Sequence, residues 1–496
     1  MKEIIKKKDL QKGILLGLKS LKNMLRVVAF LLLTVILLHT WVVWFIPKYH
    51  DGNRIMETFY AQPENSIDVL VVGSSHTFID VNTGMLWEDY GIPSFVIGGS
   101  LQPFWNSYYY IKEAMNYQQP QLIVLEAFAC DVDFDYGEEG MVINNVSGMR
   151  MNMNKLEAIR ASVTDVDGVI DFSLFFRQYH TRYDELTIDD VAPEYADPVR
   201  FENNKGFYDY LGTYPITRPV CEMNDEVVPM PNKEEYYYRL IIEYCQEQGI
   251  PLMIMVSPDG AYNPLSRGHY NYAREIAEEY GVEFVDYNEY YNEIGLNFET
   301  DFGDIGHLNY LGNRKFTSVL GEHLVDEYEL TDRRSDTSGL YDSWHENYLY
   351  LEERVDNYLL SQTEDLDEYI QRLNDLSDNY EIIIYLSEYR YVTEEMRRYL
   401  GLYSITATRP FDSRRYLING NITTTLVADD YGLYYEEYLG DHHLSVSVEG
   451  ICFDNTFVDE SYYTGVCIVV IDRHNQRVAD SVVIDSDMVY RYEAES

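Results

Sequence analysis

The sequence predicts an α/β protein with a parallel sheet flanked by helices, an N-terminal transmembrane helix, and a smaller, β-rich C-terminal α/β module. Three observations predict it. An apolar run of 20 residues lies near the start, short apolar runs alternate with helical segments over 60–330, and further strand-like runs follow residue 379. At 496 residues the chain is long enough for about three units.

Residues 27–46 contain no acid, Lys or Arg. A helix of that length spans about 30 Å, one hydrocarbon core. Trp41, Trp44 and Phe45 lie at its far end, as in an interfacial aromatic belt. The alternative is a cleaved signal peptide, whose apolar region is normally shorter, about 7–15 residues, and is followed by small residues.

The charge of the chain is divided unevenly. Residues 1–26 carry eight Lys/Arg and two acids, a balance of +6, so residues 27–496 carry −51 and the whole chain has a net charge of −45. The basic leader favours a cytoplasmic N-terminus and an extracytoplasmic body in a single-pass cell-membrane protein. An acidic body repels phosphate backbones, which argues against nucleic-acid binding. The five Cys form no CxxC motif, and we expect no metal or cofactor.

The predicted sheet domain covers 60–330. Apolar runs predict strands, and helical spacing between them predicts helices that end at Gly91, Gly249 and Gly281. An acidic, aromatic insertion at about 130–230 interrupts the pattern and is expected to be a binding loop or lid. The expected strands are 67–73, 94–97, 121–125, 251–256 and 282–285, and the expected helices are 85–90, 106–117, 233–247, 270–280 and 310–328.

A linker and helix are expected over 331–378, with the helical stretch at about 345–376, and a separate module over 379–496. Within that module the expected strands are 381–387, 443–448, 465–472 and 478–484, with one helix at 393–400 ended by Gly401.

A small-residue turn, Gly73-Ser74-Ser75-His76, follows the first predicted strand. Such a turn places a hydroxyl at the carboxyl edge of a parallel sheet, where open α/β folds have their sites. A Ser there is a nucleophile if a base reaches it.

Asp304 and His307 stand just before the last predicted helix of this domain. At that spacing the carboxylate fixes the imidazole tautomer while the other ring nitrogen faces outward. The order and position of these groups predict a Ser-His-Asp site made of Ser75, His307 and Asp304.

These two motifs resemble the SGNH (GDSL-like) hydrolase superfamily over roughly 60–330, and in particular membrane-anchored bacterial proteins of teichoic-acid D-alanylation and polysaccharide O-acetylation. The resemblance implies that Ser75 is the nucleophile, with Ser74 in place of the family's Asp. It further implies that the backbone N–H groups of Ser75 and Gly99 hold the oxyanion, and that Gln102 matches a Gln of these relatives.

The family's third block, Gly-x-Asn-Asp, is absent, because its place is occupied by Leu125-Glu126-Ala127-Phe128. Glu126 ends a buried strand near the expected site and is either a substrate contact, an acid that acts behind the catalytic groups, or a paired structural carboxylate. In the insertion, His180 and Arg182 resemble a Tyr-His-x-Arg stretch of the anchored relatives. Arg182 is expected either to bind an anionic or hydroxyl-rich substrate or to hold the lid by an ion pair. Asn309, next to His307, is a further candidate substrate contact.

The segments RPFDSRRYL at 409–417 and GVCIVVID at 465–472 are among those that make residues 379–486 resemble the interleukin-like EMT inducer (PANDER-like) domain. The resemblance implies a non-catalytic interaction module; a folded spacer is the alternative. The whole chain is then expected to be a membrane-anchored serine esterase or O-acyltransferase. Its partners would be a cell-envelope glycan or teichoic-acid-like polymer, and possibly an integral-membrane O-acyltransferase. The other hypothesis is a non-catalytic glycan-binding or envelope-assembly protein on a degenerate hydrolase fold, with tyrosines as stacking surfaces.

Overall fold

The computed structural model describes residues 2–46, 50–131, 145–163, 168–169, 181–191, 204–220, 226–386, 414–419, 422–454, 456–458, 466–485 and 488–491. The chain divides into two compact units. The first comprises 1–208 with 214–341, and the second comprises 209–213 with 342–496.

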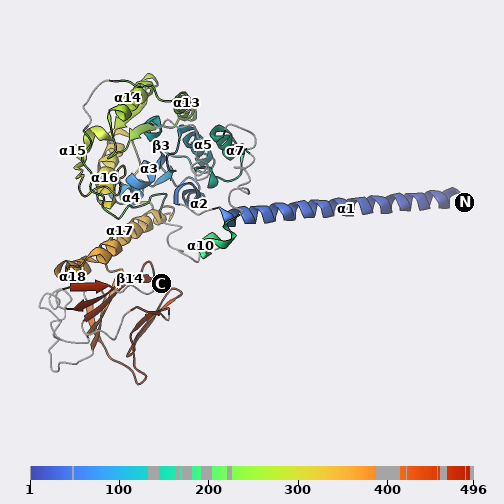
Figure 1. Ribbon diagram of the computed structural model, residues 1–496. Helices are drawn as coiled ribbons and strands as arrows, with labels where there is room; N and C mark the ends of the chain where they lie inside the picture. The colour runs from blue at the N-terminus through green and yellow to red at the C-terminus, as the bar shows by residue number, and fades with distance from the viewer. Residues whose placement is uncertain are drawn as a thin grey trace. The chain divides into compact units, whose positions relative to one another are not determined.

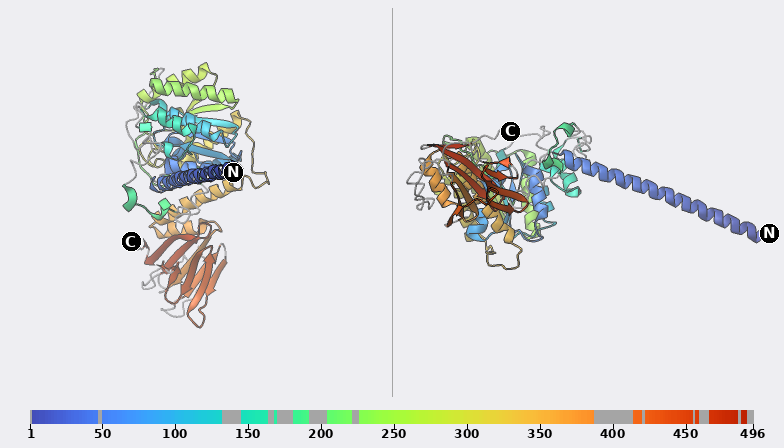
Figure 2. Two further views of the ribbon diagram at one scale, coloured as in Figure 1. Left: turned by 90° about the vertical axis from the view of Figure 1, so that its right-hand side faces the viewer. Right: turned by 90° about the horizontal axis from the view of Figure 1, so that it is seen from below.

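Helix α1 (Lys2–Phe45) is one continuous helix that contains both the basic leader and the apolar run, as both views in Figure 2 show. Its segment Leu21–Phe45 is long and apolar enough to cross a membrane, and the most apolar part of that segment is not buried in the protein. Large side chains such as Phe30 and Leu32 are exposed along it. Length and composition thus agree with a membrane-spanning helix.

The first unit is built on a five-stranded sheet with the order β2-β1-β3-β4-β5, and every strand pair is parallel. The α/β prediction and all five predicted strands of this domain are confirmed. The chain places β2 on one side of β1 and β3, β4 and β5 on the other, so the direction in which strands are added reverses beside β1. Open parallel sheets bind their ligands at the carboxyl ends of the strands next to such a reversal. The strands are β1 (Val69–Gly73), β2 (Ser94–Gly98), β3 (Leu122–Glu126), β4 (Leu252–Val256) and β5 (Glu283–Asp286).

Helices surround this sheet (Figure 1) and form two contact groups, α5 with α7 and α13, and α16 with α3 and α4. The predicted helices are present with shifted ends, and Gly91 and Gly249 adopt the left-handed conformation that ends α4 and α13. The main helices are α2 (Ile55–Ala61), α3 (Ser75–Asp80), α4 (Thr83–Tyr90), α5 (Phe104–Ala114), α7 (Met153–Ser162), α10 (Ile188–Val191), α13 (Asn232–Gln248), α14 (Pro264–Glu279), α15 (Tyr291–Ile294) and α16 (Tyr310–Glu327).

Two helix boundaries correct the sequence-based prediction. The polar turn expected after the first strand is instead the short helix α3, because the Ser74 side chain caps its first turn by accepting from His76 N. Helix α14 begins earlier than expected, because Asn263 caps it and Pro264 occupies its first position.

Two described parts of the insertion, α7 and the segment around Lys205, pack on the sheet domain. Trp105 Nε1 donates to Ser162 Oγ of α7 at 3.1 Å, and Val96 N of β2 donates to Lys205 O at 3.0 Å. These contacts tie α7 and the segment around Lys205 to the body of the first unit.

The second unit begins with two helices, α17 (Asp342–Gln362) and α18 (Leu366–Asp375), in place of the single helical stretch expected there. The second helix starts anew because Asp365 caps it by accepting from Glu368 N at 2.9 Å. The helix predicted at 393–400 lies outside the described residues.

Two antiparallel sheets complete this unit, with the orders β15-β14-β13-β6-β7-β8 and β12-β11-β10-β9. Apolar side chains of β6 and β13 alternate between a core shared with α18 and a core shared with the smaller sheet. The strands are β6 (Tyr380–Leu386), β7 (Arg414–Asn419), β8 (Ile422–Leu426), β9 (Leu433–Leu439), β10 (His442–Ser447), β11 (Ile451–Phe453), β12 (Thr456–Phe457), β13 (Val466–Asp472), β14 (Arg477–Asp485) and β15 (Met488–Arg491).

Candidate active site

The turn between β1 and α3 places Ser75 at the first position of a helix. Gly73 ends the strand, and a Cβ there would lie 2.6 Å from Glu126 Cβ and 2.8 Å from Thr77 Cγ2, so only glycine allows β1 and β3 to approach this closely. The N–H groups of a first helical turn have no acceptor within the helix. The Ser75 N–H is therefore available next to its own hydroxyl.

Glu126, the last residue of β3, holds this turn in place. Its Oε2 accepts from Ser74 N at 3.1 Å and from Ser74 Oγ at 2.7 Å, and its Oε1 accepts from Phe128 N at 2.7 Å. Burial raises the pKa of this carboxyl, while His76 and the hydrogen bonds oppose the rise. Both carboxylate oxygens of Glu126 thus accept hydrogen bonds from within the protein, as a structural carboxylate would.

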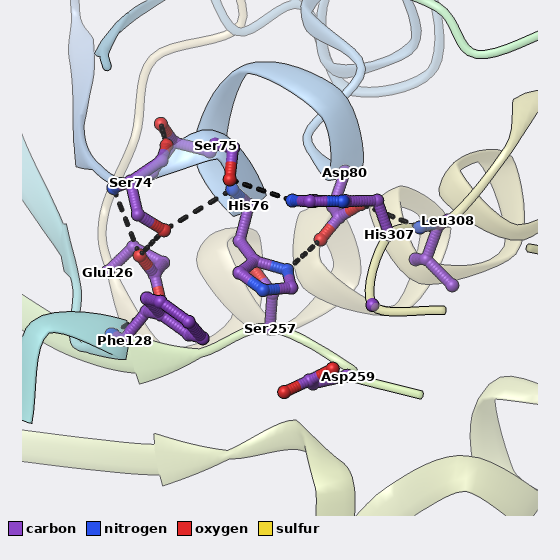
Figure 3. Close-up of polar contacts among 12 residues, drawn as sticks. Ser74, Ser75, His76, Asp80, Glu126, Phe128, Ser257, Asp259, His307 and Leu308 are labelled. Atoms are coloured by element: carbon purple, nitrogen blue, oxygen red, sulfur yellow. Dashed lines mark hydrogen bonds and ion pairs between the residues drawn. The ribbon is translucent and has the colours of Figure 1, made fainter. Parts of the chain in front are cut away.

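Ser75, His307 and Asp304 form one hydrogen-bonded chain (Figure 3 shows the Ser75 to His307 part). Ser75 Oγ lies 2.7 Å from His307 Nε2, and His307 Nδ1 lies 2.9 Å and 3.0 Å from the two oxygens of Asp304. Hydrogen positions follow from this network: Nδ1 carries the proton donated to Asp304, and Nε2 accepts from Ser75. The hydroxyl, the imidazole and the carboxylate thus have the order required for nucleophile, base and orienting acid.

The Asp304 carboxylate is held ionised. Burial opposes the charge, but hydrogen bonds from the His307 ring and from the backbone N–H groups of His307 and Gly306, both at 2.8 Å, lower the pKa of Asp304 to about 2. The side chain of Asp304 is 39% exposed and that of His307 is 21% exposed, so solvent reaches the Asp304 end of this row of hydrogen-bonded side chains.

Asn309 builds the loop that carries His307. Its side chain caps α16 by accepting from Leu311 N and Gly312 N, and its Nδ2 donates to Thr300 O at 2.8 Å. The side chain is fully buried. In this structure Asn309 fixes the path of the chain into α16.

A second His–Asp pair, which the sequence-based prediction missed, lies beside His307. His76 Nδ1 donates to Asp80 Oδ2 at 2.8 Å, and the His76 and His307 rings lie 4.6 Å apart at 33° (Figure 3). Asp80 Oδ1 accepts from Leu308 N at 3.0 Å. Burial opposes a charge on His76, but Asp80, with further help from Asp259 and Glu126, raises the pKa of His76 to about 9.

The loop after β2 carries Gly99, whose N–H group the resemblance assigns to the oxyanion. Gly99 N donates to Gly73 O at 3.3 Å, so the N–H assigned to the oxyanion extends the sheet ladder instead. A side chain at Gly99 would collide with the Asn145 amide oxygen. Gln102 donates from Nε2 to Ser107 Oγ at 3.0 Å and from its backbone N to Gly99 O at 3.0 Å, which shapes this loop.

Arg182 is engaged away from Ser75. Its guanidinium donates to Phe45 O at 2.7 Å, at the end of α1, and lies 3.3 Å from both Asp190 carboxylate oxygens. These contacts are those that the ion-pair alternative for Arg182 expects. His180 lies outside the described residues.

Within the described part of the chain, no group of three or more His, Cys, Asp or Glu side chains has an arrangement that could hold a metal ion. The contacts from Ser75 through His307 to Asp304 join a hydroxyl, an imidazole and a carboxylate.

No protein-family description and no curated protein matches the sequence. Among solved structures, a protein from Bacteroides fragilis described as a putative acylhydrolase is similar, with 11% identity and a TM-score of 0.28 over 56% of this chain and 98% of its own. A likeness at this TM-score does not assign the chain to a fold family.

Proposed function

We propose that the protein is an SGNH-type serine esterase or O-acyltransferase that forms an acyl ester on Ser75. The observation that carries the proposal is the chain of contacts from Ser75 Oγ through His307 to Asp304, with distances of 2.7 Å and 2.9 Å. These three groups lie at the carboxyl edge of the sheet, beside the reversal of strand order, where open α/β sheets bind their ligands.

In the first step Ser75 Oγ attacks the acyl carbonyl and its proton passes to His307 Nε2. The leaving alcohol takes that proton as the C–O bond breaks, which leaves an acyl-Ser75 ester. Water or an acceptor hydroxyl then attacks the ester, with His307 again as base, and Ser75 is regenerated. Asp304 keeps the ring in the correct tautomer and stabilises the imidazolium formed in each step.

The oxyanion of each tetrahedral intermediate is assigned to the Ser75 N–H. The Gly99 N–H is a second donor only if its 3.3 Å bond to Gly73 O opens. The family's Asn donor is absent, because Glu126 stands in that region and accepts hydrogen bonds. Loss of one oxyanion donor costs about 10²–10³ in rate, which is compatible with a slow transferase.

The proposed substrate is an O-acylated cell-envelope polysaccharide or teichoic-acid-like polymer. Support comes from the apolar segment Leu21–Phe45, which would anchor the enzyme in the cell membrane with its body outside the cytoplasm. An integral-membrane O-acyltransferase is the proposed donor partner. The same proposal assigns residues 379–496 the role of a non-catalytic interaction module, on the basis of their resemblance to the interleukin-like EMT inducer domain.

The test compares the full chain in detergent micelles with its Ser75→Ala variant, using p-nitrophenyl acetate turnover and the acyl content of the cell envelope. Ser318→Ala, an exposed serine on α16, is the matched control. We expect both signals to be lost in Ser75→Ala and kept in the control. Unchanged turnover and unchanged acylation in Ser75→Ala would contradict the proposal. Glycan binding that survives Ser75→Ala without any serine adduct would instead favour the non-catalytic alternative.

A further inference from the structure

We propose that His76, held by Asp80, is a positively charged positioning residue that keeps the neighbouring His307 in the neutral form a base requires. This inference rests on the proposed function, because it assigns a task to a residue that does not touch Ser75 Oγ. It adds a second His–carboxylate pair to the one formed by His307 and Asp304.

One carboxylate joins the helix of the nucleophile to the loop of the base. Asp80 is the last residue of α3, which begins at Ser75, and its side chain is fully buried. Its Oδ2 accepts from His76 Nδ1 at 2.8 Å, and its Oδ1 accepts from the backbone N of Leu308 at 3.0 Å. Because Leu308 directly follows His307, the position of the base is fixed relative to the helix that carries Ser75.

The charge on His76 faces the ring of His307. The ring centroids lie 4.6 Å apart, and the opposite neighbour of His76 is the apolar ring of Phe128, at 5.0 Å. A cation on His76 therefore disfavours a second cation on His307, at a distance where little solvent intervenes, since His76 is 3% exposed.

Carboxylates from several elements stabilise the cation on His76. Asp80 on α3 binds it directly, and Glu126 at the end of β3 and Asp259 after β4 act on it through space. His307, before α16, is a further titratable neighbour of His76, with Asp304 bound to its other ring nitrogen. Asp80 accepts two hydrogen bonds through different oxygens, which suits a carboxylate and places the shared proton on His76.

The experiment follows the rate of Ser75 modification by a fluorophosphonate against pH, using the full chain in detergent. In His76→Gln the charge is lost while an amide can still donate to Asp80. We expect the acid limb of the profile, which reports protonation of the base, to move to higher pH by about one unit. In His76→Lys the charge is kept, and the limb is expected to stay close to that of the wild type.

His323→Gln is the matched control. His323 Nε2 lies 3.1 Å from Glu283 at the start of β5, so this His–carboxylate pair is at the amino end of a strand, away from the carboxyl edge. The acid limb of the pH profile of His323→Gln should therefore stay where it is in the wild type. Thermal melts of each variant separate loss of fold from loss of charge.

An acid limb that stays in place in His76→Gln, with Ser75 still labelled, would overturn this inference and leave the proposed function standing. Equal displacement in His76→Gln and His76→Lys would also overturn it, because shape rather than charge would then be responsible. Absence of Ser75 labelling in the wild type would contradict the proposed function and this inference with it.

Discussion

Ser75 Oγ and His307 Nε2 lie 2.7 Å apart although 232 positions separate the two residues in the sequence. Two independent devices create this contact. Glu126 holds the Ser74 backbone and hydroxyl, and Asn309 caps α16 and so fixes the loop before it. The contact is therefore a property of the folded sheet edge, and its chemical consequences can be tested one residue at a time.

Asp304→Asn should lower kcat/KM for a small ester by about 10⁴, because an amide does not hold the tautomer in which Nε2 accepts from Ser75. Steady-state turnover of p-nitrophenyl acetate measures this loss. The exposed Asp336→Asn serves as the control and should behave like the wild type. A loss in Asp304→Asn no larger than that of the control would show that this carboxylate does not orient the base.

Glu126→Gln should destabilise the first unit by about 1–3 kcal/mol. One oxygen of Glu126 accepts from Ser74 and the other from Phe128, whereas a Gln side chain has a single oxygen and can serve only one of these two residues. Its NH₂ group would face the N–H of either Ser74 or Phe128. Thermal unfolding, with the exposed Glu293→Gln as control, measures the effect. A variant as stable as the control would mean that the turn does not depend on this carboxylate.

The stability that His76 contributes should depend on pH. Its folded-state pKa, about 9, lies above the ordinary value of 6.5, so the native state binds the proton more tightly than the unfolded chain. The contribution is then complete below pH 6.5 and is lost as the pH rises through 9. The difference in melting temperature between the wild type and His76→Gln should shrink between these two values. A difference that grows with pH would contradict a charged His76.

Arg182→Gln should leave turnover of a small soluble ester unchanged, because the guanidinium binds Phe45 O and Asp190 rather than the site. The expected effect is a weaker link between the end of α1 and the segment around α10. Limited proteolysis of the full chain measures that link, and ester turnover provides the activity readout. A rise in the KM of Arg182→Gln with an unchanged proteolysis pattern would contradict this prediction and indicate that Arg182 binds substrate.

The sheet domain was predictable because its strands are short, continuous apolar runs, such as Val69–Val72 and Leu252–Val256, with glycines at the helix ends. In the second unit, strands such as Ile422–Leu426 and Leu433–Leu439 were missed. Thr424, Thr425 and Glu436 are exposed and Tyr434 and Tyr435 are half-buried, so neither strand contains an apolar run.

The candidate site was predictable where a motif carries the geometry, as with Ser75 and the Asp304–His307 spacing. It was not predictable where the role depends on distant partners. Glu126 binds the Ser74 backbone, 52 positions away, and Arg182 binds Phe45 O, 137 positions away, and no local pattern reveals either partner. Asp80 was overlooked because its segment reads as a turn, although His76 and Asp80 stand four apart, the spacing of neighbours on one face of a helix.

The central claim is that Ser75 is an activated nucleophile. Its most direct test treats the full chain in detergent with a serine-directed fluorophosphonate and identifies the modified peptide by mass spectrometry, with His307→Ala as the comparison. The account predicts an adduct on Ser75 that disappears in His307→Ala. Labelling of Ser75 that persists unchanged in His307→Ala, or no adduct on Ser75 in the wild type, would contradict it.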